Sequence, residues 1–365
     1  MQFDPEHAEF FSAVSVYFAK QLREDLNVPV GIVGCNWGGT TAASWLDERL
    51  LAEDPDLNTY LLEYEEATKG LNMRRYEKKH REALDFMESS KMVKTMDRVM
   101  EGKVTKWEMI KALPLLATIA LKGMPMGPYN QNAPGCLYHN MLSQITGYTC
   151  RGVIWYQGCN DENKALMYDK LLSKMIGCWR RDWGDEMPFL IVQLAPFGTW
   201  LGANGNNFPE VRAKQDIVCK TVPNCWLASI MDVGDEKDIH PKDKRPVGER
   251  LALLARNKVY GENLLSEAPE FTELTMKKGE VSLKFANAGD GLEIRGESLQ
   301  ALDVTVDGEL IQEWTAYADG DKVILSSEKF ESGKKIQVKY AWTAFCVVNL
   351  YNSAGLAAKP FQEQV

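Results

Sequence analysis

The stretch Val153–Asp161 constrains the fold more than any other part of the sequence. It is an apolar, β-favouring run that breaks at Gly158 into polar residues, which predicts a buried strand followed by a turn. In an open α/β sheet, ligands bind where the carboxyl ends of the strands meet the loops. We therefore expect Gln157, Asn160 and Asp161 to reach a site, with amide N–H groups able to face a developing oxyanion. A strand followed by an ordinary polar turn is the alternative.

Predicted strands and helices alternate through the middle of the chain. Apolar runs predict strands at 28–34, 188–195 and 225–231, although Pro29 limits pairing in the first of them. Helical spacing of apolar residues predicts helices at 6–25, 164–181, 211–222 and 246–259. This alternation is typical of a parallel sheet covered by helices on both faces, so we expect the α/β fold class.

Two long segments differ from this pattern. Residues 52–122 are rich in Glu, Lys, Met and Leu and are predicted to be helical, either as solvated helices or as a cap over the site. Beyond Gly261, short alternating segments separated by Gly and Asp turns predict a small all-β module. We therefore expect one domain at 1–262, with 52–122 as a helical insertion, and a β-rich module at 263–365.

The composition argues against several classes of partner. A net charge of -9 is opposite to that of a nucleic-acid-binding face, and no apolar run approaches the roughly 20 residues that span a bilayer. The 8 cysteines form no CxxC pair and only 4 histidines are present, so we expect free thiols in a reducing compartment, with no metal site. The polar first residues lack a signal-peptide pattern, which favours a cytoplasmic location. No cofactor is expected, and the oligomeric state is not predicted.

His240 is the best candidate for acid–base chemistry. It follows a predicted strand, lies among acidic residues and precedes Pro241. Imidazole is suited to proton transfer near neutral pH. His80 lies in a run of charges and His139 on an apolar helix face, where a structural role is the simpler interpretation. A structural role for His240 in an acidic loop is the competing interpretation.

A pair of glycines follows the predicted strand at 28–34. Gly38 and Gly39 would allow a ligand to approach the backbone closely, although most such pairs are ordinary turns. A helix is predicted at 42–51, and its N-terminus would favour anionic groups at the same place.

Together these stretches resemble the sialate O-acetylesterases of the SGNH-hydrolase superfamily over nearly the whole chain. The resemblance rests on short motifs in a shared order: Trp37-Gly38-Gly39-Thr40, Leu137-Tyr138, Trp155-Tyr156-Gln157-Gly158, Trp179-Arg180, Ile239-His240-Pro241 with Lys244, and Asn349-Leu350-Tyr351-Asn352. It implies an SGNH-hydrolase-like, flavodoxin-like sheet and an esterase that removes acetyl groups from sialic acid. An acetylxylan-type polysaccharide esterase and a catalytically inactive carbohydrate-binding protein are the alternatives.

The resemblance also implies roles for individual residues. His240 would be the general base and acid, oriented by Asp238 or, failing that, by Asp235. Gly39 and a side-chain amide would bind the oxyanion, with Gln157 as the first choice and Asn160 as the second. The predicted contacts to an acetylated sugar are Trp37, Gly38, Trp155, Tyr156 and Asp161. Arg151 and Arg245 are candidate anchors for the carboxylate of a sialic acid.

Three departures from the family pattern bear on activity. Cys159 stands where the family has Glu, and Lys237 stands where the superfamily has the acid of its triad. The Gly-Gln-Ser-Asn motif that carries the nucleophile is absent from these 365 residues, and we expect an N-terminally shortened or a degenerate form. Ser12, Ser44 and Ser143 fit helices better than a nucleophile turn.

Overall fold

The computed structural model describes residues 11–89, 92–94, 98, 124–200, 203–277 and 279–364. The chain divides into two compact units. The first contains residues 1–42 and 147–365, and the second contains residues 43–146. The predicted boundary between 262 and 263 lies inside the first unit, where the chain changes from helix to strand.

A parallel sheet lies at the centre of the first unit, as predicted. It consists of β1 (Val153–Trp155), β2 (Phe189–Val192) and β5 (Cys225–Ala228), in the order β1-β2-β5. In its register, Trp155 is opposite Ile191, and Ile191 is opposite Leu227. All four residues of β2 are buried, because a central parallel strand is covered on both faces.

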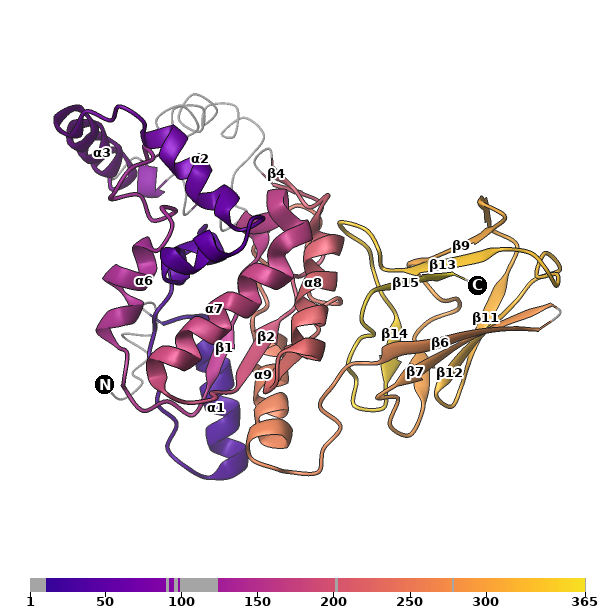
Figure 1. Cartoon of the computed structure of the whole chain (residues 1–365). Helices are drawn as coiled ribbons and strands as arrows, with labels where there is room; N and C mark the ends of the chain where they lie inside the picture. Colours follow the sequence, from indigo (N-terminus) through magenta and orange to yellow (C-terminus); the bar gives the residue numbers. More distant parts are fainter. Residues whose placement is uncertain are drawn as a thin grey trace. The chain divides into compact units, whose positions relative to one another are not determined.

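Helices cover both faces of this sheet (Figure 1). On one face, α1 (Ala13–Leu26) and α9 (Arg245–Leu254) form a core with Leu190 and Val192 of β2. On the other face lie α7 (Tyr168–Trp183) and α8 (Phe208–Thr221), and Trp179 of α7 packs against Trp155 and Phe189. The expected α/β fold class is confirmed by this layering.

The remaining part of the first unit is built from antiparallel strands, as the alternating pattern beyond Gly261 predicted. One sheet has the order β11-β12-β7-β6 and another the order β10-β9-β13-β15. The strands are β6 (Glu270–Lys277), β7 (Glu280–Ala286), β8 (Leu292–Ile294), β9 (Leu302–Val306), β10 (Glu309–Ile311), β11 (Thr315–Asp319), β12 (Lys322–Ser326), β13 (Ile336–Tyr340), β14 (Leu350–Asn352) and β15 (Phe361–Gln364). Alternate residues such as Val281, Leu283 and Phe285 point into a shared core.

The second unit is helical where the structure describes it. It contains α2 (Asn58–Thr68), α3 (Met73–Met87) and the short α6 (Cys136–Asn140), followed by a 3-10 turn at Leu142–Gln144. The predicted helical character of the insertion is confirmed in α2 and α3, whereas its residues 90–91, 95–97 and 99–122 lie outside the described residues. Whether the insertion caps the site stays a prediction.

Two predicted elements are wrong. Residues 28–34 are assigned to no strand, and Val28 and Val33 are 43% and 45% exposed, because the described chain offers them no ladder partner. The helix predicted at 42–51 is instead two 3-10 turns, Ala42–Trp45 and Glu48–Glu53, interrupted where the Asp47 side chain accepts from the Arg49 N–H. Among the described residues, no helix is long and apolar enough to cross a membrane.

Candidate active site

The turn after β1 is held by the side chain of Gln157. Its Nε2 donates to the carbonyl of Thr40 at 2.9 Å and to Oδ2 of Asp161 at 2.6 Å, while its Oε1 accepts from the Tyr168 hydroxyl at 2.8 Å. Both hydrogens of this amide therefore have acceptors within the protein. Gln157, the first choice for an oxyanion donor, braces the turn in this arrangement and would have to release one of these acceptors to bind an oxyanion.

Asp161 joins the turn to the glycine loop. Its Oδ2 also accepts from the N–H of Ala42 at 2.9 Å, and the residue is only 2% exposed. In this structure the carboxylate holds two backbone segments together, and its predicted contact with substrate stays a prediction. Because these segments are residues 40–42 and 157–161, Asp161 brings the glycine pair next to the end of β1.

The glycine loop is exposed. Gly38 and Gly39 lie on the surface, Gly39 has a φ of 70°, and the Trp37 side chain is 54% exposed. A positive φ favours glycine at this position. Thr40 closes the turn, since its Oγ1 donates to the carbonyl of Trp37 at 2.8 Å. This loop therefore exposes an aromatic ring and two residues without side chains.

Asn160 and the aromatic pair before Gln157 lie in contrasting environments. Asn160 is exposed in the 3-10 turn Cys159–Met167. Trp155 is 7% exposed and meets Trp179 edge-on, with 5.6 Å between ring centroids, while its predicted substrate contact stays a prediction. Tyr156 is partly buried against the α1–α9 core, and the ammonium of Lys244 lies 5.7 Å from its ring centroid.

His240 lies in the loop between β5 and α9, with Asp238 as its acidic neighbour. The N–H of His240 donates to Oδ1 of Asp238 at 2.8 Å, and its Nδ1 lies 3.5 Å from the same oxygen. Partial burial and the charge of Lys244 lower the pKa of His240, and they outweigh Asp238, which acts in the opposite direction. Asp235 accepts instead from the N–H of Lys237 at 2.8 Å. The contacts thus favour Asp238 over Asp235 as the orienting acid.

Lys244 connects the histidine loop to the turn after β1. Burial lowers its pKa, against the attraction of Asp238 and Cys159. Burial also raises the pKa of the Cys159 thiol to about 12, although Lys244 and Arg212 oppose this shift. The thiol that replaces the family's Glu is therefore neutral near pH 7. The loop of His240 consequently lies beside the turn that holds Gln157 and Asn160, because Lys244 is close to Tyr156 and Cys159.

Three further residues around this site escaped the sequence analysis. Gln215 donates to the carbonyl of Gln157 at 3.1 Å and accepts from the N–H of Leu194 at 2.9 Å. Arg212 is fully buried and donates to four carbonyls. Trp200 meets the His240 ring. Gln215 and Arg212 resemble surface residues of an amphipathic helix in the sequence, and no signal distinguishes them from ordinary solvent positions.

The three serines considered as nucleophiles have structural positions. Ser12 caps α1, with its Oγ 3.5 Å from the N–H of Ser15, and Ser44 is fully buried. Ser143 donates to the carbonyl of His139 at 2.6 Å. The prediction that these serines belong to helices or their caps is confirmed.

The two arginines considered as anchors for a carboxylate are both engaged. Arg151 donates to the carbonyl of Val259 at 3.3 Å and lies over the ring of Tyr260. Arg245 pairs with Glu249 at 2.6 Å. The N–H of Arg245 donates to Asp243 in the loop of His240, but its guanidinium is directed to Glu249, and the guanidinium of Arg151 is directed to Val259 and Tyr260.

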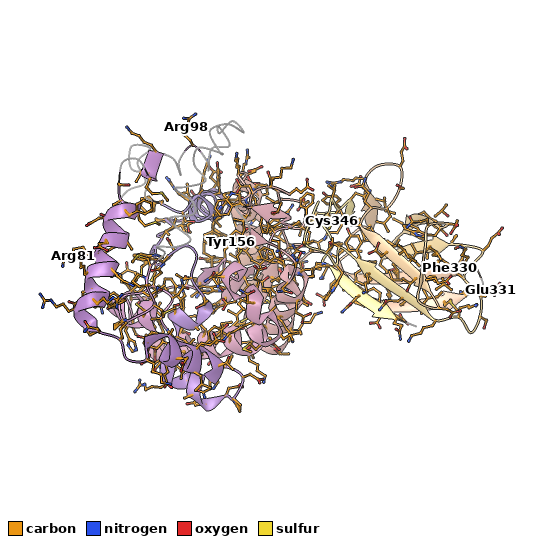
Figure 2. The ribbon with its side chains drawn as sticks, turned by 90° about the horizontal axis from the view of Figure 1, so that it is seen from above. Arg81, Arg98, Tyr156, Phe330, Glu331 and Cys346 are labelled. Carbon is orange, nitrogen blue, oxygen red and sulfur yellow. The ribbon has the colours of Figure 1, made fainter. Side chains whose placement is uncertain are left out.

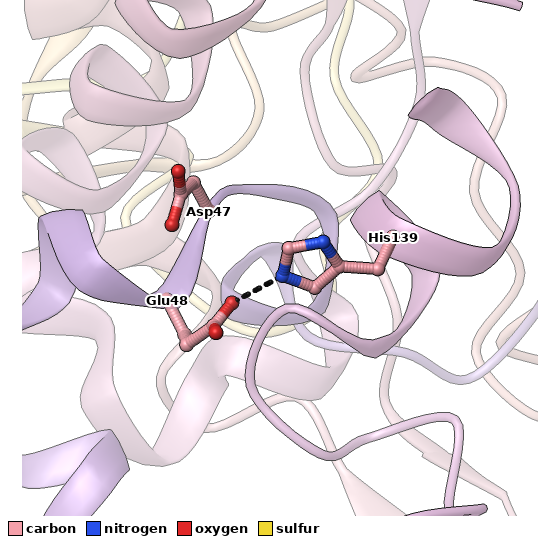
Figure 3. A group of neighbouring side chains, drawn as sticks. All are labelled: Asp47, Glu48 and His139. Atoms are coloured by element: carbon pink, nitrogen blue, oxygen red, sulfur yellow. Dashed lines mark hydrogen bonds and ion pairs between the residues drawn. The ribbon is translucent and has the colours of Figure 1, made fainter. Parts of the chain in front are cut away.

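A separate cluster of ionisable side chains lies in the second unit (Figure 3). Asp47, Glu48 and His139 each offer a ligand atom within 4.8 Å of the others, and Nε2 of His139 lies 2.7 Å from Glu48. Asp47, however, already binds the Arg49 guanidinium through both carboxylate oxygens. A metal ion here would compete with that cation, so we assign the cluster no metal.

Comparison with known proteins shows which family this chain is similar to. Residues 108–256 match the family model described as carbohydrate esterase, sialic acid-specific acetylesterase. Curated relatives named sialate O-acetylesterase include those of Rattus norvegicus (23% identical, 98% of this chain), Mus musculus (24%, 98%) and Homo sapiens (23%, 97%). This chain spans 64% of the length of the two rodent proteins and 61% of the human one.

A solved structure is similar across the same extent. The crystal structure of a carbohydrate acetylesterase from Xanthomonas citri superposes with a TM-score of 0.70 and 28% identity, covering 99% of this chain and 67% of that one. The family model, the named relatives and the solved structure all point to carbohydrate acetylesterases. The chain is similar to the sialate O-acetylesterase family in the family model, in the named relatives and in the solved structure.

Proposed function

We propose that the protein is a carbohydrate O-acetylesterase that acts by acyl transfer. The observation that carries this proposal is the pairing of His240 with Asp238 in a loop that Lys244 joins to the turn of Gln157 and Asn160. Acyl transfer needs a base, donors for the oxyanion and a nucleophile. The first two are available around this turn.

In the proposed reaction His240 moves the protons. As the attacking hydroxyl adds to the acetyl carbonyl, Nε2 of His240 takes its proton, and the carbonyl oxygen becomes an oxyanion. His240 then returns the proton to the sugar oxygen as the acetyl C–O bond breaks. Water, activated by the same imidazole, releases acetate in the second half. The attacking hydroxyl would come from the family's Gly-Gln-Ser-Asn motif, which these residues do not contain.

For the oxyanion we propose the backbone N–H of Gly39 and the amide of Asn160. Asn160 and Gly39 are both exposed, so a ligand can reach them from solvent, whereas Gln157 is partly buried and donates to Thr40 and Asp161. Removing one such donor typically costs about 10²–10³ in kcat. Gln157 then serves by fixing the turn, and Asp161 by fixing the glycine loop against it.

A sialic acid is the proposed substrate because of the cation in this site. Among the described residues, no carboxylate lies within 4.0 Å of the Lys244 ammonium, which faces the ring of Tyr156 instead. A partly buried ammonium without an ion pair suits a ligand carboxylate. The curated relatives are named for the same substrate class. A neutral acetylated polysaccharide has no carboxylate with which the Lys244 ammonium could pair.

The test is hydrolysis of O-acetylated sialic acid and of a neutral acetylated sugar, with His240→Ala as the control. Because the serine motif is absent, we expect the 365 residues to be very slow, and a version supplied with that motif to be active and dependent on His240. In the active form, Lys244→Met should raise KM for the sialic acid alone, and Lys242→Met, which alters an exposed lysine of the same loop, should not.

Other outcomes select the alternatives. Equal activity on both sugars, unchanged in Lys244→Met, would favour the polysaccharide esterase. Binding without turnover, even with the motif supplied, would favour a carbohydrate-binding protein, whose exposed Trp37 could stack on a sugar ring. Rapid, His240-dependent turnover by the 365 residues themselves would contradict our account of the nucleophile.

A further inference from the structure

The imidazole of His240 has an aromatic neighbour from a different part of the chain. Trp200 ends the two-residue strand β3 (Thr199–Trp200), which pairs with β4 (Ala203–Asn204) in a small hairpin. The rings of Trp200 and His240 meet edge to face, with centroids 5.1 Å apart and planes at 86°. This is a favoured geometry for aromatic pairs.

The hairpin and the histidine loop are bonded to each other through their backbones. The N–H groups of Gly198 and Thr199 both donate to the carbonyl of Glu236, at 3.2 and 2.8 Å, and Phe197 forms a bridge with Asp235. Trp200 and His240 are thus carried by two segments held in register. Their contact follows from this backbone pairing rather than from two mobile side chains.

Glycines make this approach possible. A Cβ on Gly234 would lie 2.1 Å from the carbonyl oxygen of Pro196, and one on Gly198 would lie 2.6 Å from that of Glu236. Both distances are shorter than any tolerated contact, and the obstacle is backbone, which cannot swing aside. The two segments therefore lie closer together than side chains would allow.

The base of the hairpin is anchored as well. The N–H of Phe197 donates to the carbonyl of Ala344 at 2.9 Å, and Phe197, which is 1% exposed, packs against Phe208 of α8. Asp238, by contrast, holds the imidazole only loosely, since its oxygen is 3.5 Å from Nδ1 and is already used by the N–H of His240. A second constraint on the ring is needed for a fixed orientation.

We propose that Trp200 is a positioning residue for His240. Its ring restricts rotation of the imidazole, so that Nδ1 stays toward Asp238 and Nε2 is presented to the reacting groups. The assignment of His240 as the base rests on the proposed function, whereas the contact between the rings does not. The imidazole is half exposed, and Trp200 covers part of it, while Asp238 on the same loop and Lys244 at the start of α9 are the charged groups acting on it.

The test is a ¹⁵N-histidine NMR titration of the 365-residue chain, with the His240 signals assigned by their loss in His240→Ala. In Trp200→Ala, hydration should raise the titration midpoint of His240 toward that of an ordinary histidine. The ring nitrogens should also change from a predominantly Nδ1-protonated tautomer to a mixture. Trp200→Phe, which keeps a ring, should restore both properties. The matched control is Trp183→Leu, at the end of α7, where the indole donates to the carbonyl of Tyr148. It should change neither property.

An unchanged midpoint and tautomer in Trp200→Ala would overturn the proposal, whether or not the protein proves to be an esterase. If the form supplied with the serine motif is active, Trp200→Ala should lower kcat by roughly tenfold to a hundredfold with a smaller change in KM. A rise in KM at unchanged kcat, with an unchanged titration, would make Trp200 a contact for the sugar and would equally overturn the positioning role.

Discussion

At the scale of single residues, the state of His240 is decided by competition between burial and charge. Asp238 favours the imidazolium, but partial burial and Lys244 favour the neutral ring, and the pKa falls below its ordinary value. A base must be unprotonated to accept a proton. The surroundings of His240 therefore keep it in the reactive form down to a lower pH than an isolated histidine would allow.

Asp238→Asn should lower the pKa of His240 further. Asn retains an oxygen that can accept from the backbone N–H of His240, but it loses the charge that favours the imidazolium. The acid limb of kcat/KM, or the NMR titration where activity is absent, should move to lower pH. Asp235→Asn is the matched control, because its carboxylate accepts from Lys237. A larger shift in Asp235→Asn would reverse the choice of orienting acid.

At the scale of elements, the pairing of the hairpin with the histidine loop is the feature that shapes the site. Neither segment contains a long strand or helix in the described residues, so its conformation depends on the other. A Cβ added to a glycine should disturb the pairing of the hairpin with the histidine loop wherever that glycine faces a carbonyl of the other segment.

Gly234→Ala should separate the two segments. The added Cβ would lie 2.1 Å from the Pro196 oxygen, and such overpacking costs about 1–3 kcal/mol. The free energy of unfolding, measured in urea, should fall by this amount. Gly177→Ala is the matched control, because a Cβ added there, on the exposed side of α7, would meet no atom within 4 Å. This substitution should raise the free energy of unfolding by roughly 0.5–1 kcal/mol. Equal stability of Gly234→Ala and the wild type would show that the loop gives way freely.

Sequence patterns correctly predicted the helices and strands that show a regular or continuous apolar pattern. They failed for segments whose conformation depends on pairing with another segment. The runs at β1, β2 and β5 are apolar enough to require burial, and they are strands. Residues 28–34 have a similar composition, but a strand is defined by its ladder, and composition does not supply one.

The same reasoning applies to the site. His240 was found because an imidazole among acids is unusual, and the described contacts place Asp238 beside it. Asp161 was expected at the site because it follows a strand end, and Trp155 because of the family resemblance. The sequence did not indicate that both side chains are buried. Trp200 was missed because a two-residue strand has no period, and its neighbour lies 40 positions away in sequence.

At the scale of the first unit, ionic and polar contacts bind the α/β layer to the C-terminal strands. Lys359, which is 6% exposed, reaches Asp216 of α8 at 2.8 Å and Glu270 of β6 at 2.6 Å, and Lys220 pairs with the same two acids. Burial opposes ionisation of Asp216, but these lysines prevail and lower its pKa. The stability supplied by Asp216 is therefore present above the pKa of an unfolded Asp and is lost as the pH falls.

Lys359→Met should destabilise the unit by on the order of 2 kcal/mol, because two charge-assisted hydrogen bonds are lost while Lys220 still compensates the acids. Thermal unfolding of the whole chain at pH 7 measures this loss. Lys329→Met removes an ion pair with Glu313 whose partners are 50% and 71% exposed, and it should change stability by less than about 1 kcal/mol. Similar losses in the two variants would mean that burial of Lys359 is unimportant.

Helix α8 unites these contacts, since it carries Gln215 toward β1, Arg212 toward two carbonyls of the C-terminal strands' loop, and Asp216 toward Lys359. In Figure 2, Tyr156 marks the α/β layer and Cys346 the side of the strands that meets it. The directions in which Gln215, Arg212 and Asp216 point are set by their positions around the axis of α8. An insertion of a single residue early in α8 would turn each by about 100° away from its partner. Homologues can therefore vary in length between the C-terminal strands, but hardly within the first two turns of this helix.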